Sequence, residues 1–169
     1  MPKDKNLKFN YLEIGCFEGL SAFHVLSEFK FVNAYFLDLW DMPNKNSITL
    51  TNDFNAVEKV FDKNLSDFKF TKIKGDSVTS MRRLFRKEVY FDFIYLDGSH
   101  NGEDILSDAI EAFKILQNRG IIYFDDFLQH DKDRIIQSYI GIEKFLDLCS
   151  NNLEIMYFQN NLVIKKNIY

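Results

Sequence analysis

Acidic residues follow two apolar runs of this chain. Residues 91–96 read Phe-Asp-Phe-Ile-Tyr-Leu and lead into Asp97, and residues 120–124 lead into Asp125 and Asp126. Apolar runs of this length are typical of buried strands, and ligands of open α/β sheets bind beyond the carboxyl ends of the strands. Three carboxylates at two such ends predict a cation site. The alternative is that each acid only caps a following helix or accepts backbone N–H groups.

A glycine turn lies near the start of the chain. Residues 10–14 predict a strand, residues 20–29 predict a helix, and the segment Glu13-Ile14-Gly15-Cys16-Phe17-Glu18-Gly19 joins them. Glycines at a strand-to-helix turn let the backbone approach a ligand closely and direct free N–H groups toward it. Because many α/β proteins place glycines here merely for packing, this spacing needs a second feature to support it.

Asp38 supplies that second feature. It ends the apolar run 31–37, and an acid at the end of a second strand can accept hydrogen bonds from both hydroxyls of a ribose. The glycine turn lacks the G-x-G-x-x-G arrangement that surrounds a pyrophosphate. The pattern therefore predicts a cofactor that contains adenosine without pyrophosphate, and it disfavours a nicotinamide-dependent oxidoreductase.

The remaining apolar patterns predict an α/β fold in a single domain over residues 1–169. The predicted strands are 10–14, 31–37, 68–73, 90–96 and 121–124, and a hairpin pairs 153–158 with 162–166. The predicted helices are 20–29, 105–116, 133–149 and one that carries Arg82, Arg83, Arg86 and Lys87 mostly on one face. Alternating strands and helices indicate a mostly parallel sheet that is covered on both faces and closed by the hairpin. Residues 41–51 are either a substrate loop or an ordinary surface connection. The short stretch before the first strand predicts that an N-terminal helical cap is missing.

Composition excludes several classes of protein. The chain has 169 residues, of which 46% are hydrophobic, and a formal net charge of -4. The acidic balance argues against a dedicated nucleic-acid binder. The two cysteines, Cys16 and Cys149, do not make a disulfide framework, and no apolar run has the length of a signal-peptide core or a membrane span. We therefore expect a cytoplasmic protein without a membrane partner.

The chain resembles the class I S-adenosylmethionine-dependent methyltransferases. The resemblance rests on Glu13-x-Gly15-x-x-x-Gly19, on Asp38 and on Gly75-Asp76-Ser77 at three successive strand ends. The segments Asp97-Gly98-Ser99-His100 and Gly120-Ile121-Ile122-Tyr123-Phe124-Asp125-Asp126 are similar to the small-molecule O-methyltransferase branch, which includes macrocin-type and cephalosporin-pathway enzymes. This resemblance implies a Rossmann-like fold with seven strands in the order three, two, one, four, five, seven, six.

The resemblance also implies which residues bind S-adenosylmethionine. Gly15 and Gly19 would line its methionine portion, Asp38 would hold the ribose, and Asp76 with Ser77 would contact the adenine. The full set of expected cofactor-binding residues is Glu13, Gly15, Cys16, Phe17, Gly19, Asp38, Asp76, Ser77 and Asp97.

The same resemblance implies a metal and a base. Asp97, Asp125 and Asp126 match acidic ligands for Mg²⁺, and His100 matches the catalytic base, with His130 as the alternative. Mg²⁺ prefers oxygen ligands, and two adjacent substrate hydroxyls could complete its shell. A metal-coordinated hydroxyl gives up its proton more readily to a neutral histidine.

These inferences lead to one expected function and one alternative. The expected reaction moves a methyl group from S-adenosylmethionine to a hydroxyl of a small molecule, with a sugar or a vicinal diol as the leading acceptor. The alternative is a noncatalytic module of the same fold that binds an adenosine cofactor or a protein partner. The sequence leaves open whether the protein forms a homo-oligomer.

Overall fold

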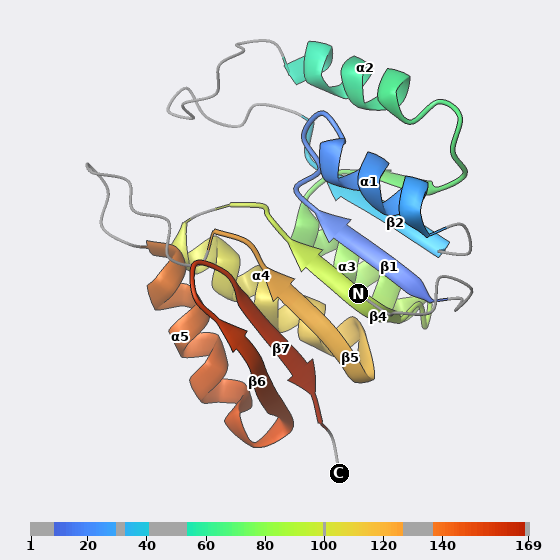
Figure 1. Cartoon of the computed structure of the whole chain (residues 1–169). Coiled ribbons are helices and arrows are strands. Elements are labelled where there is room, and N and C mark those ends of the chain that lie inside the picture. Colours follow the sequence, from blue (N-terminus) through green and yellow to red (C-terminus); the bar gives the residue numbers. More distant parts are fainter. Residues whose placement is uncertain (1–8, 30–32, 41–53, 100, 127–136, 168–169) are drawn as a thin grey trace.

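A seven-stranded sheet forms the centre of the molecule (Figure 1). The computed structural model describes residues 9–29, 33–40, 54–99, 101–126 and 137–167. The strands are β1 (Asn10–Ile14), β2 (Asn33–Asp38), β3 (Thr71–Lys74), β4 (Phe91–Leu96), β5 (Leu116–Phe124), β6 (Leu153–Phe158) and β7 (Leu162–Lys166). Their order is β3-β2-β1-β4-β5-β7-β6, which confirms the predicted order.

The sheet is parallel except at its C-terminal side. β3, β2, β1, β4 and β5 pair in parallel, whereas β7 pairs antiparallel with both β5 and β6. The predicted terminal hairpin is therefore confirmed. The parallel strands bring their carboxyl ends to one edge, where ligands of such sheets bind.

Helices cover the sheet on both faces (Figure 1). They are α1 (Leu20–Glu28), α2 (Phe54–Asn64), α3 (Ser77–Arg86), α4 (Gly102–Ile115) and α5 (Gln137–Cys149), followed by the short 3₁₀ helix η1 (Ser150–Asn152). α1 and α2 share one apolar core with the sheet, and α3, α4 and α5 share the core on the opposite face. None of the helices in the described ranges combines the length and the apolar character needed to cross a membrane.

Helix α2 is an element that the sequence patterns missed. Val57 and Phe61 of α2 and Leu65 directly after it are spaced four residues apart and pack in the same core as α1. This spacing is the ordinary signal of an amphipathic helix. The sequence therefore contained enough information to predict a helix between residues 51 and 71.

The C-terminal end of α4 differs from the prediction. Residues 118–120 were expected to terminate the helix, but α4 ends at Ile115 and β5 begins directly at Leu116. Gly120 lies within the strand, where an added Cβ would be 3.0 Å from the Asp92 carbonyl oxygen. The glycine therefore permits a close approach to β4 rather than a helix stop.

Gly141 lies inside α5, where glycine is unfavourable for the helix but allows close packing against α4. An added Cβ would lie 2.2 Å from the Gly102 carbonyl oxygen and 2.6 Å from Ile105 Cγ2, both in α4. The absence of a side chain lets the two helices pack closely at this point. This close packing comes with the lower helix propensity of glycine, which costs about 1 kcal/mol relative to alanine.

Candidate active site

Backbone hydrogen bonds continue past the strands at the carboxyl edge of the sheet. The N–H of Gly15 donates to the Leu37 carbonyl at 3.0 Å, and the N–H of Asp97 donates to the Ile14 carbonyl at 2.9 Å. The N–H of Asp125 donates to the Leu96 carbonyl at 2.9 Å. The parallel register thereby fixes the glycine turn and the strand-end acids at one edge.

The glycine turn is pressed against the end of β4. Gly15 and Gly19 have φ angles of 85° and 84°, in the left-handed region that favours glycine. A Cβ on Gly15 would lie 2.0 Å from the Asp97 carbonyl oxygen. Position 15 therefore excludes any side chain on both conformational and steric grounds.

Asp38 holds the glycine turn in place. Its Oδ2 accepts the N–H groups of Cys16 at 2.8 Å and Phe17 at 2.9 Å, and its Oδ1 accepts the N–H of Trp40 at 2.8 Å. Each carboxylate oxygen offers two acceptor sites. Among the described contacts, Oδ2 is saturated and one site of Oδ1 remains for a ligand.

Trp40 packs inside the protein rather than beside an acceptor. Its ring is buried against Phe61, with centroids 4.6 Å apart, and its Nε1 donates to the Phe17 carbonyl at 3.0 Å. Trp40 thus stabilises the glycine turn from the α2 side. An aromatic residue just past a strand end could either border an acceptor pocket or pack in the core, and the burial of Trp40 shows that it packs in the core.

Glu13 lies fully buried on β1 below the turn. The hydroxyls of Tyr11 and Ser21 donate to its carboxylate. Burial raises the pKa of Glu13 to about 7; the two hydrogen bonds oppose this shift, and the charges of Asp97 and Asp38 add to it. Because Glu13 is buried, its carboxyl acts on the site by fixing the Tyr11 and Ser21 hydroxyls and through its charge.

Tyr11 was missed by sequence reasoning, although a signal was present. Residues two apart on a strand share one face, so Tyr11 and Glu13 point to the same side of the sheet. Burial removes the water partners of both the tyrosine hydroxyl and the acid, and the hydrogen bond between them replaces those partners.

Asp97 is one of the three acids that match metal ligands. Burial is the main cause that raises its pKa to about 7, and the charges of Asp125 and Asp126 contribute to the same shift. The Tyr95 hydroxyl donates to Asp125 Oδ2, and Asp126 has a left-handed φ of 51°. The described residues contain no arrangement of three or more histidine, cysteine or acidic side chains suited to a metal ion. The assignment of Asp97, Asp125 and Asp126 as ligands stays a prediction.

The β6–β7 hairpin contributes to this acidic edge, which sequence reasoning did not anticipate. Asn161 in the hairpin turn accepts the Asp126 N–H at 3.1 Å and donates through Nδ2 to the Tyr123 hydroxyl. The rings of Tyr95 and Tyr123 stack with centroids 5.3 Å apart. Two tyrosines and an asparagine therefore fix the acidic end of β5.

Asp76 and Ser77 lie at the N-terminus of α3. Asp76 Oδ1 accepts the Thr79 N–H at 2.7 Å and caps the helix. Hydrogen bonds with the side chain and the backbone N–H of Thr79 lower the pKa of Asp76. Ser77 donates its hydroxyl to Asp108 of α4. Their predicted contact with adenine is untested, as are the expected roles of His100 and His130, which lie outside the described residues.

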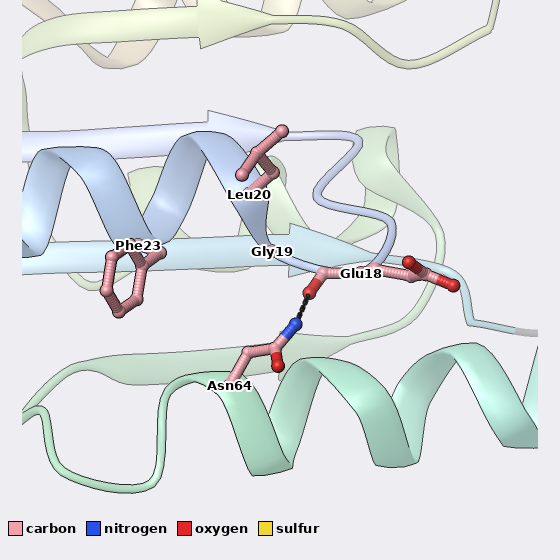
Figure 2. A pocket seen from close by; sticks show the side chains of 5 residues that line it. All are labelled: Glu18, Gly19, Leu20, Phe23 and Asn64. Atoms are coloured by element: carbon pink, nitrogen blue, oxygen red, sulfur yellow. Dashed lines mark hydrogen bonds between the residues drawn. The ribbon is translucent and has the colours of Figure 1, made fainter.

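A cleft of about 360 Å³ opens on the outer side of the glycine turn (Figure 2). Its lining consists of Glu18, Gly19, Leu20, Phe23 and Asn64. Asn64 Nδ2 donates to the Glu18 carbonyl at 3.0 Å and ties the end of α2 to the turn. Among the described residues that line the cleft, none is a strand-end acid.

The region that contains these strand ends matches a protein-family model described as a methyltransferase domain, over residues 12–127. The chain belongs to this methyltransferase family. The match extends from β1 past the end of β5, and therefore includes the glycine turn, Asp38 and the strand-end acids. No curated protein matches this chain significantly in sequence.

Solved structures share the fold of this chain at low sequence identity. The MycE methyltransferase from the mycinamycin biosynthetic pathway, in complex with Mg and SAH, aligns with a TM-score of 0.65 and 18% identity. The alignment covers 96% of this chain and 46% of MycE. This chain thus spans less than half of the MycE chain.

Two other neighbours are closer in length. An O-methyltransferase from Bacillus cereus in complex with SAH has a TM-score of 0.69 and 14% identity, covering 94% of this chain and 74% of that one. The calicheamicin methyltransferase CalS11 has a TM-score of 0.63 and 15% identity, covering 93% of this chain and 72% of that one. At these identities the likeness establishes the fold.

Proposed function

We propose that the protein binds S-adenosylmethionine at the glycine turn and transfers its methyl group to a hydroxyl of a small molecule, with a sugar or a vicinal diol as the acceptor. We also propose that residues 1–169 act as one methyltransferase domain. The observation that carries the proposal is the convergence of Glu13, Asp38 and Asp97 around a glycine turn, from three neighbouring strands.

The charge of this edge suits the cofactor. S-adenosylmethionine carries a positive sulfonium and a positive ammonium group, and opposite charges attract strongly where water is partly excluded. Asp97 and Asp38 lie close enough to Glu13 to raise its pKa, so the turn is surrounded by mutually repelling acids. A bound cation would relieve that repulsion. The neighbouring N-terminus of α1 suits the carboxylate of the methionine portion.

The ribose has one clear acceptor in this arrangement. The remaining site of Asp38 Oδ1 can take one ribose hydroxyl while the other three sites hold the turn and Trp40. The adenine would then extend toward the turn at residues 75–77, because the Gly75 N–H donates to the Asp38 carbonyl at 3.0 Å. The similarity to SAH-bound methyltransferases supports the same cofactor.

The donor set at β4 and β5 fits a divalent cation in kind. Asp97, Asp125 and Asp126 would hold it, because carboxylate oxygens are the ligands that Mg²⁺ prefers. A bound cation would orient the acceptor and lower the pKa of its hydroxyl. The neighbour MycE was crystallised with Mg, which supports this part of the proposal.

The reaction itself is a direct methyl transfer. The acceptor hydroxyl loses its proton to a base, for which His100 is proposed, and its oxygen forms a bond to the methyl carbon. The bond from that carbon to sulfur breaks, and sulfur keeps the electron pair, leaving S-adenosylhomocysteine and a methyl ether. The chain's task is to align the two reactants, which can contribute about 7–11 kcal/mol to catalysis.

Calorimetric titration of S-adenosylhomocysteine into the purified protein tests the cofactor first. We expect saturable binding, followed by methyl transfer to members of a panel of sugars and vicinal diols, with activity lost in metal-free buffer. Activity that persists without metal would contradict the cation's role. Binding without turnover on the whole panel would favour the noncatalytic module, and failure of folded protein to bind would refute the proposed cofactor.

A further inference from the structure

A buried acid on α4 lies between two turns of the proposed cofactor site. Asp108 is 5% exposed, and its Oδ1 accepts the Ser77 hydroxyl at 2.5 Å, next to the turn that follows β3. Its Oδ2 lies toward the turn that follows β4, since a Cβ added to Gly98 would be 3.6 Å from that oxygen. The carboxyl therefore bonds to one turn and lies near the other, although strands β1 and β2 separate β3 from β4 in the sheet.

These two turns flank the position that a base would take beside the ribose acid. The Gly75 N–H donates to the carbonyl of Asp38, and Gly15 of the cofactor turn contacts the Asp97 carbonyl. A nucleoside with its ribose on Asp38 would therefore place its base near Ser77. Asp108 is within reach of that base only through Ser77, because its own side chain is buried.

The hydrogen bond to Asp108 determines what Ser77 can recognise. A serine hydroxyl has a single proton, and an ionised carboxylate is only an acceptor. Burial raises the pKa of Asp108 to about 6; the Ser77 hydrogen bond opposes the shift, and Asp104 and Asp76 add to it. Near pH 8 the carboxylate is ionised, the Ser77 proton points at it, and the lone pairs of Ser77 Oγ are left for a donor.

We infer that Asp108 is a positioning residue that orients the Ser77 hydroxyl as an acceptor and so makes the nucleoside site select a 6-aminopurine over a 6-oxopurine. The 6-amino group of adenine donates a hydrogen bond to Ser77 Oγ, whereas the 6-oxo group of hypoxanthine presents another acceptor. This inference rests on the proposed binding of an adenosine cofactor.

The test compares S-adenosylhomocysteine with S-inosylhomocysteine by calorimetry at pH 8. For the unmodified protein we expect the inosine compound to bind at least about tenfold more weakly, the size of one mismatched buried hydrogen bond. In Asp108→Asn the amide can donate to Ser77 Oγ and free the serine proton, so the ratio should fall to within about threefold. Ser77→Ala should lower the ratio in the same way and provides a second variant if Asp108→Asn unfolds.

Glu111→Gln is the matched control. Glu111 lies three residues after Asp108 on α4 and is also 5% exposed. Its carboxylate accepts hydrogen bonds from Arg82 of α3 and from Lys114, and not from Ser77. A loss of general α3–α4 packing would affect this variant too, so its ratio should stay at that of the unmodified protein.

The outcomes separate the two proposals. If folded, unmodified protein does not bind S-adenosylhomocysteine, the proposed cofactor is wrong and the role of Asp108 falls with it. If it binds but Asp108→Asn and Ser77→Ala keep the unmodified ratio, the cofactor stands and the positioning role of Asp108 is overturned.

Discussion

Asp38 shows how one side chain can combine a structural task with a binding task. Three backbone N–H groups converge on its carboxylate, so the residue fixes the glycine turn before any ligand arrives. A hydrogen bond to a charged group contributes about 1.5–3 kcal/mol to stability. Asp38 is only half-buried, so after its removal water can bond to some of the exposed N–H groups and reduce the loss. A substitution at this position therefore changes stability and binding together.

For Asp38→Ala we expect the free energy of unfolding to fall by about 2–4 kcal/mol, because the N–H groups of Cys16, Phe17 and Trp40 lose their acceptor. Binding of S-adenosylhomocysteine should also be lost. Urea unfolding and calorimetry measure the two effects.

Asp92→Ala is the control for this experiment. Asp92 also accepts a backbone N–H from a neighbouring strand, that of Asn10 at 2.8 Å, but at the opposite end of the sheet. It should lower stability slightly and leave binding unchanged. Equal loss of binding in both variants would contradict a specific role for Asp38.

Glu13 should make stability depend on pH. Its pKa is about 7 in the folded protein and near 4.3 in an unfolded chain, so the folded state holds the extra proton between these values. The stability associated with this group is present below about pH 4.3 and is lost as pH rises through 7, a change of roughly 3–4 kcal/mol.

Glu13→Gln should therefore flatten the fall in stability between pH 5 and 8 and leave the variant more stable than the unmodified protein at pH 8. Some slope of the same sign will remain, because the pKa values of Asp97 and Asp108 are also raised. Urea unfolding across this pH range measures it. Glu143→Gln, at a carboxylate that accepts the exposed Tyr139 hydroxyl, is the control and should keep the unmodified profile.

At the scale of elements, the contact between α4 and α5 depends on one glycine. Alanine at an exposed helix position would normally stabilise by about 1 kcal/mol relative to glycine. At Gly141 the new Cβ would collide with the Gly102 carbonyl and Ile105, so we expect alanine to destabilise the protein here.

Gly141→Ala should lower the free energy of unfolding by about 1–3 kcal/mol, the usual cost of overpacking, as measured by urea unfolding. Asp147→Ala on the exposed side of the same helix should change it by no more than about 0.5 kcal/mol. A stabilised Gly141→Ala variant would show that the two helices separate without cost.

At the scale of the whole molecule, the sheet ends in an apolar edge. β6 is the outermost strand, and Met156 at its centre is 53% exposed. An exposed apolar edge strand is a template for pairing with another chain, and an edge lysine prevents such pairing. We expect the unmodified protein to self-associate as its concentration rises.

Met156→Lys should reduce this association, as measured by sedimentation velocity over a range of concentrations. Leu148→Lys on α5 removes a more exposed apolar side chain, 69% exposed, without altering the strand edge. If both variants reduce association equally, general surface hydrophobicity and not edge pairing is the cause.

The sequence alone determined the sheet and the location of its acids. Apolar runs that end in Asp38, Asp97 and Asp125 are local patterns, because strand burial and strand ends depend mainly on neighbours in the chain. Local patterns also predicted the terminal hairpin, whereas the order of the seven strands was implied by the family resemblance; the structure confirms both. The local patterns missed α2 and misplaced the end of α4.

The tertiary structure decided what each acid does. Glu13 is buried under Tyr11 and Ser21, Asp38 is mostly occupied by the turn, and Asp108 reaches Ser77 from another helix. Sequence spacing cannot foresee these pairings, because Ser77 and Asp108 are 31 residues apart and meet only when α3 packs on α4. A carboxylate's pKa and remaining hydrogen-bonding capacity depend on burial and on partners that only the folded chain brings together.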